Sequence, residues 1–191
     1  MSDLTKRVKE NFKDSIISGA PLPMLPQDIA ILAAFTFMKA VVAYDAIPNV
    51  EPFFPRAVRE RFRQSLAIPP NVQMWIAAYQ GTQRYSGRCI AGVSAAAFGP
   101  YEGTEFLAFT YVVGHLVLQL LSPRWKDVRN RTRVLPVHVP LPHWNPAVIS
   151  FWPDTGFPGS WPPPKYIGDD TIEQFIDRFK GKIMGSRTVI F

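Results

Sequence analysis

The sequence predicts an α+β fold in which N-terminal helices precede a mostly antiparallel sheet, from about residue 72 to 152, and a C-terminal helix follows. Three observations support this prediction. Apolar residues recur at helical spacing up to about residue 68, β-branched and aromatic residues dominate from residue 72 onward, and a short amphipathic pattern returns near residue 170. We expect the helices to lie on one side of the sheet.

The 191 residues suffice for one substantial domain, and we expect a single globular domain over residues 1–191. The pattern divides it into a helical part (1–68), a sheet-forming part (71–152), and a Pro/Trp-rich connection with the C-terminal helix (153–191).

The first helix is predicted from apolar residues at every fourth position. These residues are Leu4, Val8, Phe12 and Ile16. This spacing puts them on one face of a helix, and Gly19 is typical of the residue that follows a helix end. The pattern predicts an amphipathic helix that packs one face on the core.

Residues 29–45, IAILAAFTFMKAVVAYD, are apolar almost throughout. A helix that spans a bilayer needs roughly 20 predominantly apolar residues, and this run is shorter and contains Lys39. Pro26 suits the first turn of a helix, and Asp28 suits its positive end. We therefore expect a buried helix without membrane contact, in which Lys39 is paired or extends to solvent.

A third helix is predicted between Pro55 and the proline pair at 69–70. Its apolar residues fall on one face and its arginines on the opposite face. The apolar set is Phe54, Val58, Phe62 and Leu66, and the arginine set is Arg56, Arg59 and Arg63.

From residue 72 the pattern favours strands. Residues 72–79 and 87–98 are expected to pair as a hairpin across the turn-forming residues between them. Residues 105–121 form a long apolar run that favours a strand, in which Gly114 marks either a bulge or the start of a helix. A short strand is expected at 147–152.

The proline-rich stretches of the C-terminal part are expected to be extended chain packed on the core. The final helix is predicted from Asp170 and Glu173, which match an Asp variant of the capping box, and from Gly181, which is typical of a helix end.

Composition limits the classes of partner and of site that we expect for this protein. The net charge of +6 permits nucleic acid or an anionic surface as a partner. The single cysteine, Cys89, excludes an internal disulfide and a cysteine-rich zinc site, which suits a reducing cytoplasm. The charged N-terminus has no signal-peptide pattern, so we expect a cytoplasmic location.

Catalytic and metal-binding patterns are incomplete. The histidines, His115, His138 and His143, have none of the short spacings usual for zinc ligands. Ser94 lacks the second glycine of a nucleophile elbow. A Cys89–His115 nucleophile pair requires the two side chains to meet in the fold, and a buried structural thiol is the commoner role. We therefore expect no catalytic residue, metal or cofactor, and an enzyme built on this pair is the least favoured hypothesis.

Clustered arginines are the stronger functional signal. Phosphate contacts require accessible positive charges in a line, and such charges occur on the third predicted helix and in the connection 124–133, RWKDVRNRTR. The candidate nucleic-acid contacts are Arg56, Arg59, Arg63, Arg129, Arg131 and Arg133. Trp144, Trp152 and Trp161 are suited to stacking on bases, but their proline-rich surroundings favour a packing role.

Four stretches carry a resemblance to a known family: VKENFKDSIISG, IAILAAFTFMKAVV, IPPNVQMWIAAYQG and FTYVVGHLVLQLL. Over residues 4–121 the chain resembles the C-terminal companion region of a group of uncharacterised bacterial HNH-endonuclease-like proteins. In that group a zinc-binding nuclease module comes first. No cysteine or histidine of this chain matches a residue of that module, so the resemblance implies the companion region alone or a truncated product.

These observations lead to two hypotheses. The first is a non-catalytic accessory or recognition module that contacts DNA or RNA through its arginine clusters. The alternative is a protein–protein interaction module, as a subunit, an inhibitor or a homodimer, that uses the Pro/Trp-rich surface at 140–166.

Overall fold

A computed structural model describes residues 2–82, 85–94, 105–126, 132–133, 145–153, 159–180 and 183–190. The helices are α1 (Ser2–Ser18), α2 (Pro26–Asp45), α3 (Arg56–Ser65) and α4 (Asp169–Lys180). The strands are β1 (Leu22–Pro23), β2 (Gln73–Tyr79), β3 (Tyr85–Ser94), β4 (Glu105–Val113), β5 (Leu116–Lys126), β6 (Thr132–Arg133), β7 (Ile149–Trp152), β8 (Ser160–Trp161), β9 (Tyr166–Ile167) and β10 (Ile183–Ile190). The predicted α+β fold is confirmed: N-terminal helices, an antiparallel sheet and a short C-terminal helix.

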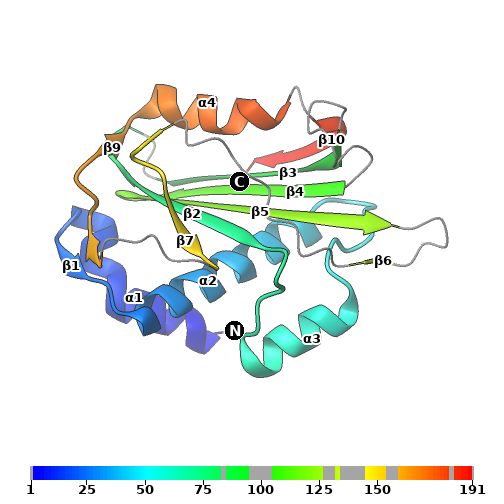
Figure 1. Cartoon of the computed structure of the whole chain (residues 1–191), viewed down its shortest axis with the longest axis horizontal. Coiled ribbons are helices and arrows are strands. Elements are labelled where there is room, and N and C mark those ends of the chain that lie inside the picture. Colours follow the sequence, from blue (N-terminus) through cyan, green and yellow to red (C-terminus); the bar gives the residue numbers. More distant parts are fainter. Residues whose placement is uncertain are drawn as a thin grey trace.

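Six strands form the main sheet in the order β10-β3-β4-β5-β2-β7, and every neighbouring pair in this order is antiparallel (Figure 1). β6 pairs with the C-terminal end of β5, and β9 adds a short parallel pairing to β2. β1 and β8 pair separately as a two-stranded sheet.

The predicted hairpin between residues 72–79 and 87–98 is wrong. β2 pairs with β5, whereas β3 lies between β4 and β10. The apolar run 105–121 is also not one strand, because a turn at Gly114 divides it into β4 and β5. The long β4–β5 hairpin occupies the centre of the sheet, so β2 and β3 lie on opposite sides of it.

Glycine is required at position 114 by two features. Its φ of +57° is the conformation that tight hairpins favour at their first central residue. A Cβ atom there would lie 2.1 Å from the carbonyl oxygen of Ile16 in α1. The same oxygen accepts a 2.7 Å hydrogen bond from the backbone N–H of His115. The end of α1 therefore packs directly on the β4–β5 turn.

In the C-terminal part, the pattern predicted the strand β7 and the final helix but not the last strand, β10. The strand expected at 147–152 is present as β7. β10 is not indicated by its sequence, IMGSRTVI, whose polar central residues interrupt the apolar pattern. The C-terminal helix begins at Asp169, one residue before the expected cap, so Asp170 lies in its first turn. Gly181 lies outside the described residues.

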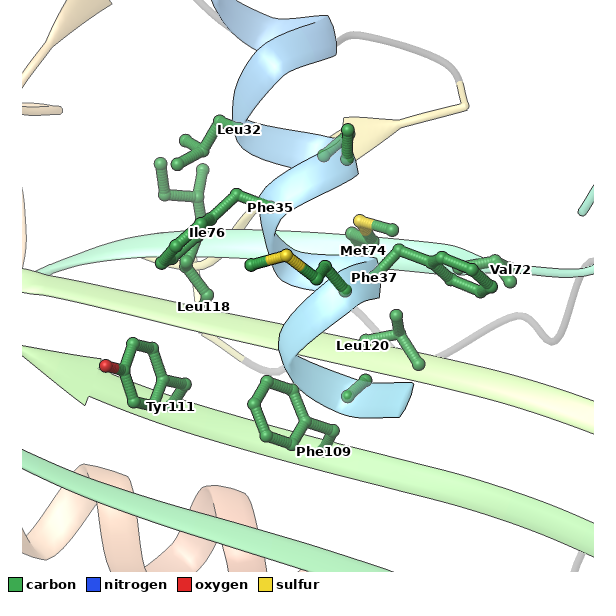
Figure 2. Packing of buried hydrophobic residues seen from close by; sticks show 14 of the residues in the cluster. Leu32, Phe35, Phe37, Val72, Met74, Ile76, Phe109, Tyr111, Leu118 and Leu120 are labelled. Atoms are coloured by element: carbon green, nitrogen blue, oxygen red, sulfur yellow. The ribbon is translucent and has the colours of Figure 1, made fainter. Parts of the chain in front are cut away.

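The apolar helix α2 packs across one face of the sheet (Figure 2). Its residues Leu32, Phe35 and Phe37 meet side chains from β2, β4 and β5, and Phe37 is fully buried. The strand residues in this layer are Met74, Ile76, Phe109, Tyr111, Leu118 and Leu120. α1 adds Leu4, Val8 and Phe12 to the same core, which explains why α2 is apolar on nearly every side.

The prediction that α2 is a buried helix is confirmed. In the described part of the chain α2 is the helix long and apolar enough to cross a bilayer, but 67% of its most apolar window is buried inside the protein. Lys39 is accommodated by two aromatic rings: its Nζ atom lies 5.4 Å from the Phe35 ring centre and 5.7 Å from that of Tyr111. These are cation–π distances.

The expectation that all helices lie on one side of the sheet is wrong. Figure 1 shows α4 on the face opposite to α1, α2 and α3. Ile172 of α4 joins a second buried cluster with strand residues such as Phe106, Val117 and Leu121. The central strands are apolar on both faces, and each face needs a cover that excludes water.

Candidate functional site

Helix α3 presents the first arginine cluster. Phe62 anchors the helix in the core, with its ring centre 4.8 Å from that of Phe37. Of the predicted apolar set, Phe62 is buried within α3, Phe54 is buried before the helix begins, and Leu66 is its exposed C-terminal cap. Arg56 and Arg63 are exposed. Arg56 forms an ion pair with Glu60 at 2.6 Å, whereas Arg63 forms none with a described residue.

Arg59 has a different environment from its two neighbours. Its Nη1 atom lies 3.3 Å from Oδ2 of Asp45, the last residue of α2, and both side chains are about one-third exposed. Its Nε atom is buried and has no acceptor among the described residues. Arg59 thus joins α3 to the end of α2, which leaves Arg56 and Arg63 as the accessible charges of this cluster.

The second arginine cluster is described only in part. Arg129 and Arg131 lie outside the described residues. The backbone of Arg133 lies in β6 and pairs with Trp125 of β5. This pairing attaches the end of the 124–133 connection to the C-terminal end of β5.

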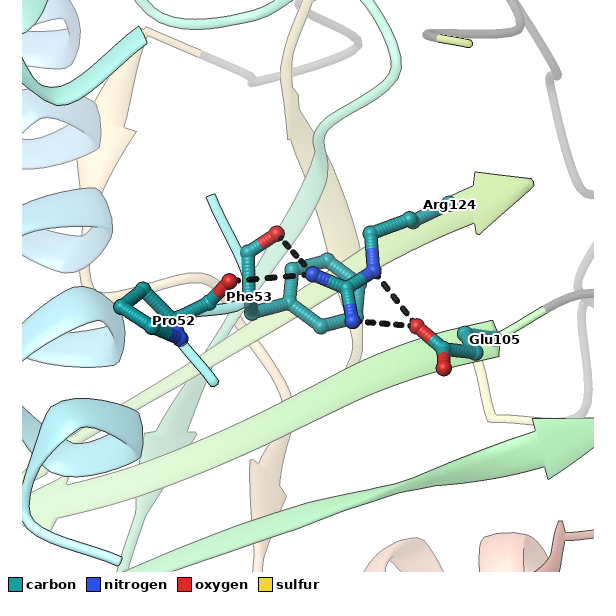
Figure 3. A network of polar contacts seen from close by, with 4 residues as sticks. All are labelled: Pro52, Phe53, Glu105 and Arg124. Atoms are coloured by element: carbon teal, nitrogen blue, oxygen red, sulfur yellow. Dashed lines mark hydrogen bonds and ion pairs between the residues drawn. The ribbon is translucent and has the colours of Figure 1, made fainter. Parts of the chain in front are cut away.

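Arg124 lies next to that pairing and has a structural role (Figure 3). Its guanidinium is buried, forms an ion pair with Glu105, and donates hydrogen bonds of 3.0 and 2.6 Å to the carbonyl oxygens of Pro52 and Phe53. It also lies 4.5 Å from the centre of the Phe53 ring. Arg124 therefore holds the segment before α3 against the end of β5 and is not available to a phosphate.

This arrangement places the start of α3 and strand β6, which contains Arg133, at one end of the sheet. Residues 52–53, which Arg124 holds, precede α3 by only a few residues, and β6 pairs beside Arg124. Helix α3 and strand β6 are separated by roughly 70 residues in the sequence, so their proximity depends on the fold.

A groove between α1, α2 and α3 borders the α3 cluster. Its cavity volume is about 970 Å³. The apolar part of its lining consists of Leu4, Phe37, Met38, Val41, Val42, Phe62 and Leu66. The charged part consists of Asp3, Arg7, Asp45, Arg56, Arg59, Glu60 and Arg63. The sequence did not indicate this groove, because its three walls are far apart along the chain.

Cys89 and His115 are not brought together. Cys89 pairs with Phe109, four residues before the end of β4, so at about 3.4 Å per residue its backbone lies roughly 13 Å from the turn that holds His115. Burial raises the pKa of the Cys89 thiol to about 12, which keeps it protonated. Nδ1 of His115 lies 2.9 Å from the carbonyl oxygen of Tyr79. The pair therefore lacks the geometry of a nucleophile and its base.

Metal-binding chemistry finds no support in the described residues. They contain no group of three or more His, Cys, Asp or Glu side chains that could hold a metal ion. His138 and His143 lie outside these residues. Ser94 is the last residue of β3, where its backbone pairs with Ile183 of β10.

The tryptophans of the alternative surface lie mainly in the interior where they are described. Trp161 is only 3% exposed and joins the α2 core, and Trp152 is half-buried in β7. Trp144 and much of the segment 140–166 lie outside the described residues. The described tryptophans thus have the packing role that their proline-rich surroundings favour.

No family model, curated protein or solved structure matches the chain. The resemblance to the companion region of HNH-endonuclease-like proteins therefore stays a prediction.

Proposed function

We propose that the protein is a non-catalytic recognition module that contacts DNA or RNA through arginines at one end of its sheet. The observation that carries the proposal is the Arg124 network, which attaches α3 beside the strand that pairs with Arg133. A polyanion that lies along this end would meet α3 and the strand that contains Arg133. Phosphate groups need little more than such accessible charges, and the net charge of +6 favours encounter.

The ion pairs of α3 do not prevent phosphate binding. Arg56 and Glu60 form an exposed pair on one helix, and such pairs contribute only about 0–1 kcal/mol. Arg56 can therefore exchange Glu60 for a phosphate at small cost. Arg63 forms no ion pair with a described residue, and Arg59 stays engaged with Asp45. We assign the main contacts on α3 to Arg56 and Arg63.

The remaining contacts belong to the 124–133 connection. Arg129, Arg131 and Arg133 are proposed as phosphate contacts because β6 attaches this connection to the same end of the sheet. The resemblance to the companion region of nucleases agrees with a partner of this class. A cytoplasmic location, where nucleic acid is abundant, is part of the same proposal.

Fluorescence anisotropy of labelled single- and double-stranded DNA and RNA, titrated across a salt series, tests the proposal. Each phosphate contact adds about 0.9 to the slope of log K against log salt for a duplex. The double variant Arg56→Glu/Arg63→Glu should lower this slope by about 2. The matched control is Lys13→Glu/Lys165→Glu, which changes the net charge equally at exposed positions outside the groove lining.

The outcomes separate a surface contact from a general charge effect. A large loss of affinity in the α3 variant and a small loss in the control support the proposal. Equal losses in both variants, or no binding by the wild type at low salt, would refute it. The homodimer form of the alternative is then examined by measuring the mass in solution as a function of protein concentration.

A further inference from the structure

The groove between α1, α2 and α3 has a volume within the range of small-ligand sites. Ligand sites commonly enclose roughly 300–1,000 Å³, are lined mainly by apolar side chains and occur between helices. The cavity here is about 970 Å³, and half of its lining residues are apolar. Val42 and Leu66 are 50% and 38% exposed, although most apolar side chains of the described chain are buried. The groove thus offers an apolar surface to an occupant.

Leu66 supplies a second, independent observation. It caps α3 with a φ of +56°, in the left-handed conformation that helix ends usually give to glycine. A leucine in this conformation is strained, and strained residues cluster at functional sites. Its side chain lines the groove. The strained residue, Leu66, therefore lies where a ligand in the groove would contact it.

The charges around the groove define which ligand fits. Its lining contains four arginines and three carboxylates, which leaves one positive charge in excess. Arg56 and Arg59 are paired with Glu60 and Asp45. Arg7 of α1, Arg63 of α3 and the third carboxylate, Asp3, form no ion pair with a described residue. A ligand with one negative charge would neutralise the single excess positive charge of the groove lining.

We propose that the groove binds a monomeric long-chain carboxylate of the fatty-acid class. Its hydrocarbon chain lies along Val41, Val42 and Leu66, and its carboxylate lies between Arg7 and Arg63. Arginine is suited to this role, because its planar fork donates to both carboxylate oxygens. A nucleic-acid strand carries many charges and no apolar chain, so it does not fill the apolar part of the groove. The proposal goes beyond nucleic-acid recognition; Arg63 serves in both proposals, and Arg56, the other proposed phosphate contact on α3, also lines the groove.

Calorimetric titration with hexanoate, octanoate, decanoate and dodecanoate, each below its micelle-forming concentration, tests the proposal. The affinity should rise about threefold to fourfold with every added methylene group. Replacing octanoate with 1-octanol should reduce affinity about tenfold, because the charge-assisted hydrogen bonds are lost. In an Arg63→Gln variant, this discrimination between carboxylate and alcohol should shrink.

Three variants connect binding to the groove. Val42→Glu places a negative charge on the apolar wall and should weaken dodecanoate binding at least about tenfold. Ile17→Glu is its matched control, because Ile17 is 61% exposed on α1 and does not line the groove. Leu66→Gly should weaken dodecanoate binding while the protein keeps or gains stability, because glycine relieves the left-handed strain.

Several outcomes would overturn the proposal. They are no binding of dodecanoate, equal binding by the Val42→Glu and Ile17→Glu variants, and binding to phospholipid vesicles without binding to monomeric dodecanoate. A concentration-dependent dimer that Val42→Glu abolishes would assign the groove to a second copy of the chain instead. Nucleic-acid affinity should be equal in the Val42→Glu and Ile17→Glu variants, so failure of one proposal is distinguishable from failure of the other.

Discussion

Replacing Arg124 with alanine tests whether one buried guanidinium holds the α3 segment against the end of β5. The Arg124 side chain is 8% exposed and that of Glu105 is 28% exposed. Removing one partner of a buried ion pair costs about 3–5 kcal/mol. Water reaches the partly exposed Glu105 carboxylate and reduces this cost. The carbonyl oxygens of Pro52 and Phe53 lose their donors, at roughly 1 kcal/mol each.

These contributions overlap, and we expect a total loss of about 3–4 kcal/mol in the free energy of unfolding. Urea denaturation followed by circular dichroism measures this loss as a lower midpoint at an unchanged m-value. Arg124→Lys keeps the charge but cannot reach three acceptors with a planar fork, so we expect about half the loss. Arg56→Ala, which breaks an exposed pair, should cost less than about 1 kcal/mol.

Comparing the stability losses of Arg124→Ala and Arg56→Ala tests the structural role of Arg124. If Arg124→Ala costs no more than Arg56→Ala, the network in Figure 3 does not hold the two segments together. The structural basis for placing α3 beside β6 at one end of the sheet would then be lost. An Arg124→Ala protein that stays folded should also bind nucleic acid more weakly, because α3 is no longer held beside β5.

Two further predictions concern the core of the fold. Gly114→Ala should cost at least about 2 kcal/mol of unfolding free energy, because its Cβ would meet the Ile16 oxygen. The control Gly159→Ala, at φ +78° but with open space around it, should cost only about 1 kcal/mol. Equal losses of stability in urea denaturation would contradict this reasoning. The pKa of Cys89 rises from 9.0 to about 12 on folding, so its contribution to stability is present below pH 9 and decreases between pH 9 and 12. At pH 8 a thiol reagent should label the urea-unfolded protein readily and the native protein only slowly; rapid native labelling would contradict the burial of this thiol.

The spacing of apolar residues predicted the helices well, because it depends on a single element. The four-residue spacing of Leu4, Val8 and Phe12 defines one face of a helix wherever that helix packs, and all three residues are buried. The run at 29–45 was too apolar for a surface helix, so burial followed from composition. On α3, Phe62 is buried, whereas Arg56 and Arg63 are exposed.

Strand pairing was not predictable in the same way. Residues 72–79 were expected to pair with the next strand, but β5, more than 30 residues later, forms that ladder. A strand can pair with any partner that presents a compatible apolar face, so its neighbour depends on distant parts of the chain. The apolar run at 105–113 did contain a signal for two covered faces, since buried strands read as continuous apolar stretches. Only the structure showed that α4 supplies the second cover.

The sequence by itself determined the fold class, the buried helix and the arginines on one face of α3, because these depend on spacing within a single element. The tertiary structure alone decided which residues from distant segments meet. It buried Arg124 against Glu105 and bonded it to Phe53, so the segment before α3 lies against the end of β5. It also formed the groove from three helices. The physical reason is that the free energy of a contact depends on both partners, and a linear pattern specifies only one of them.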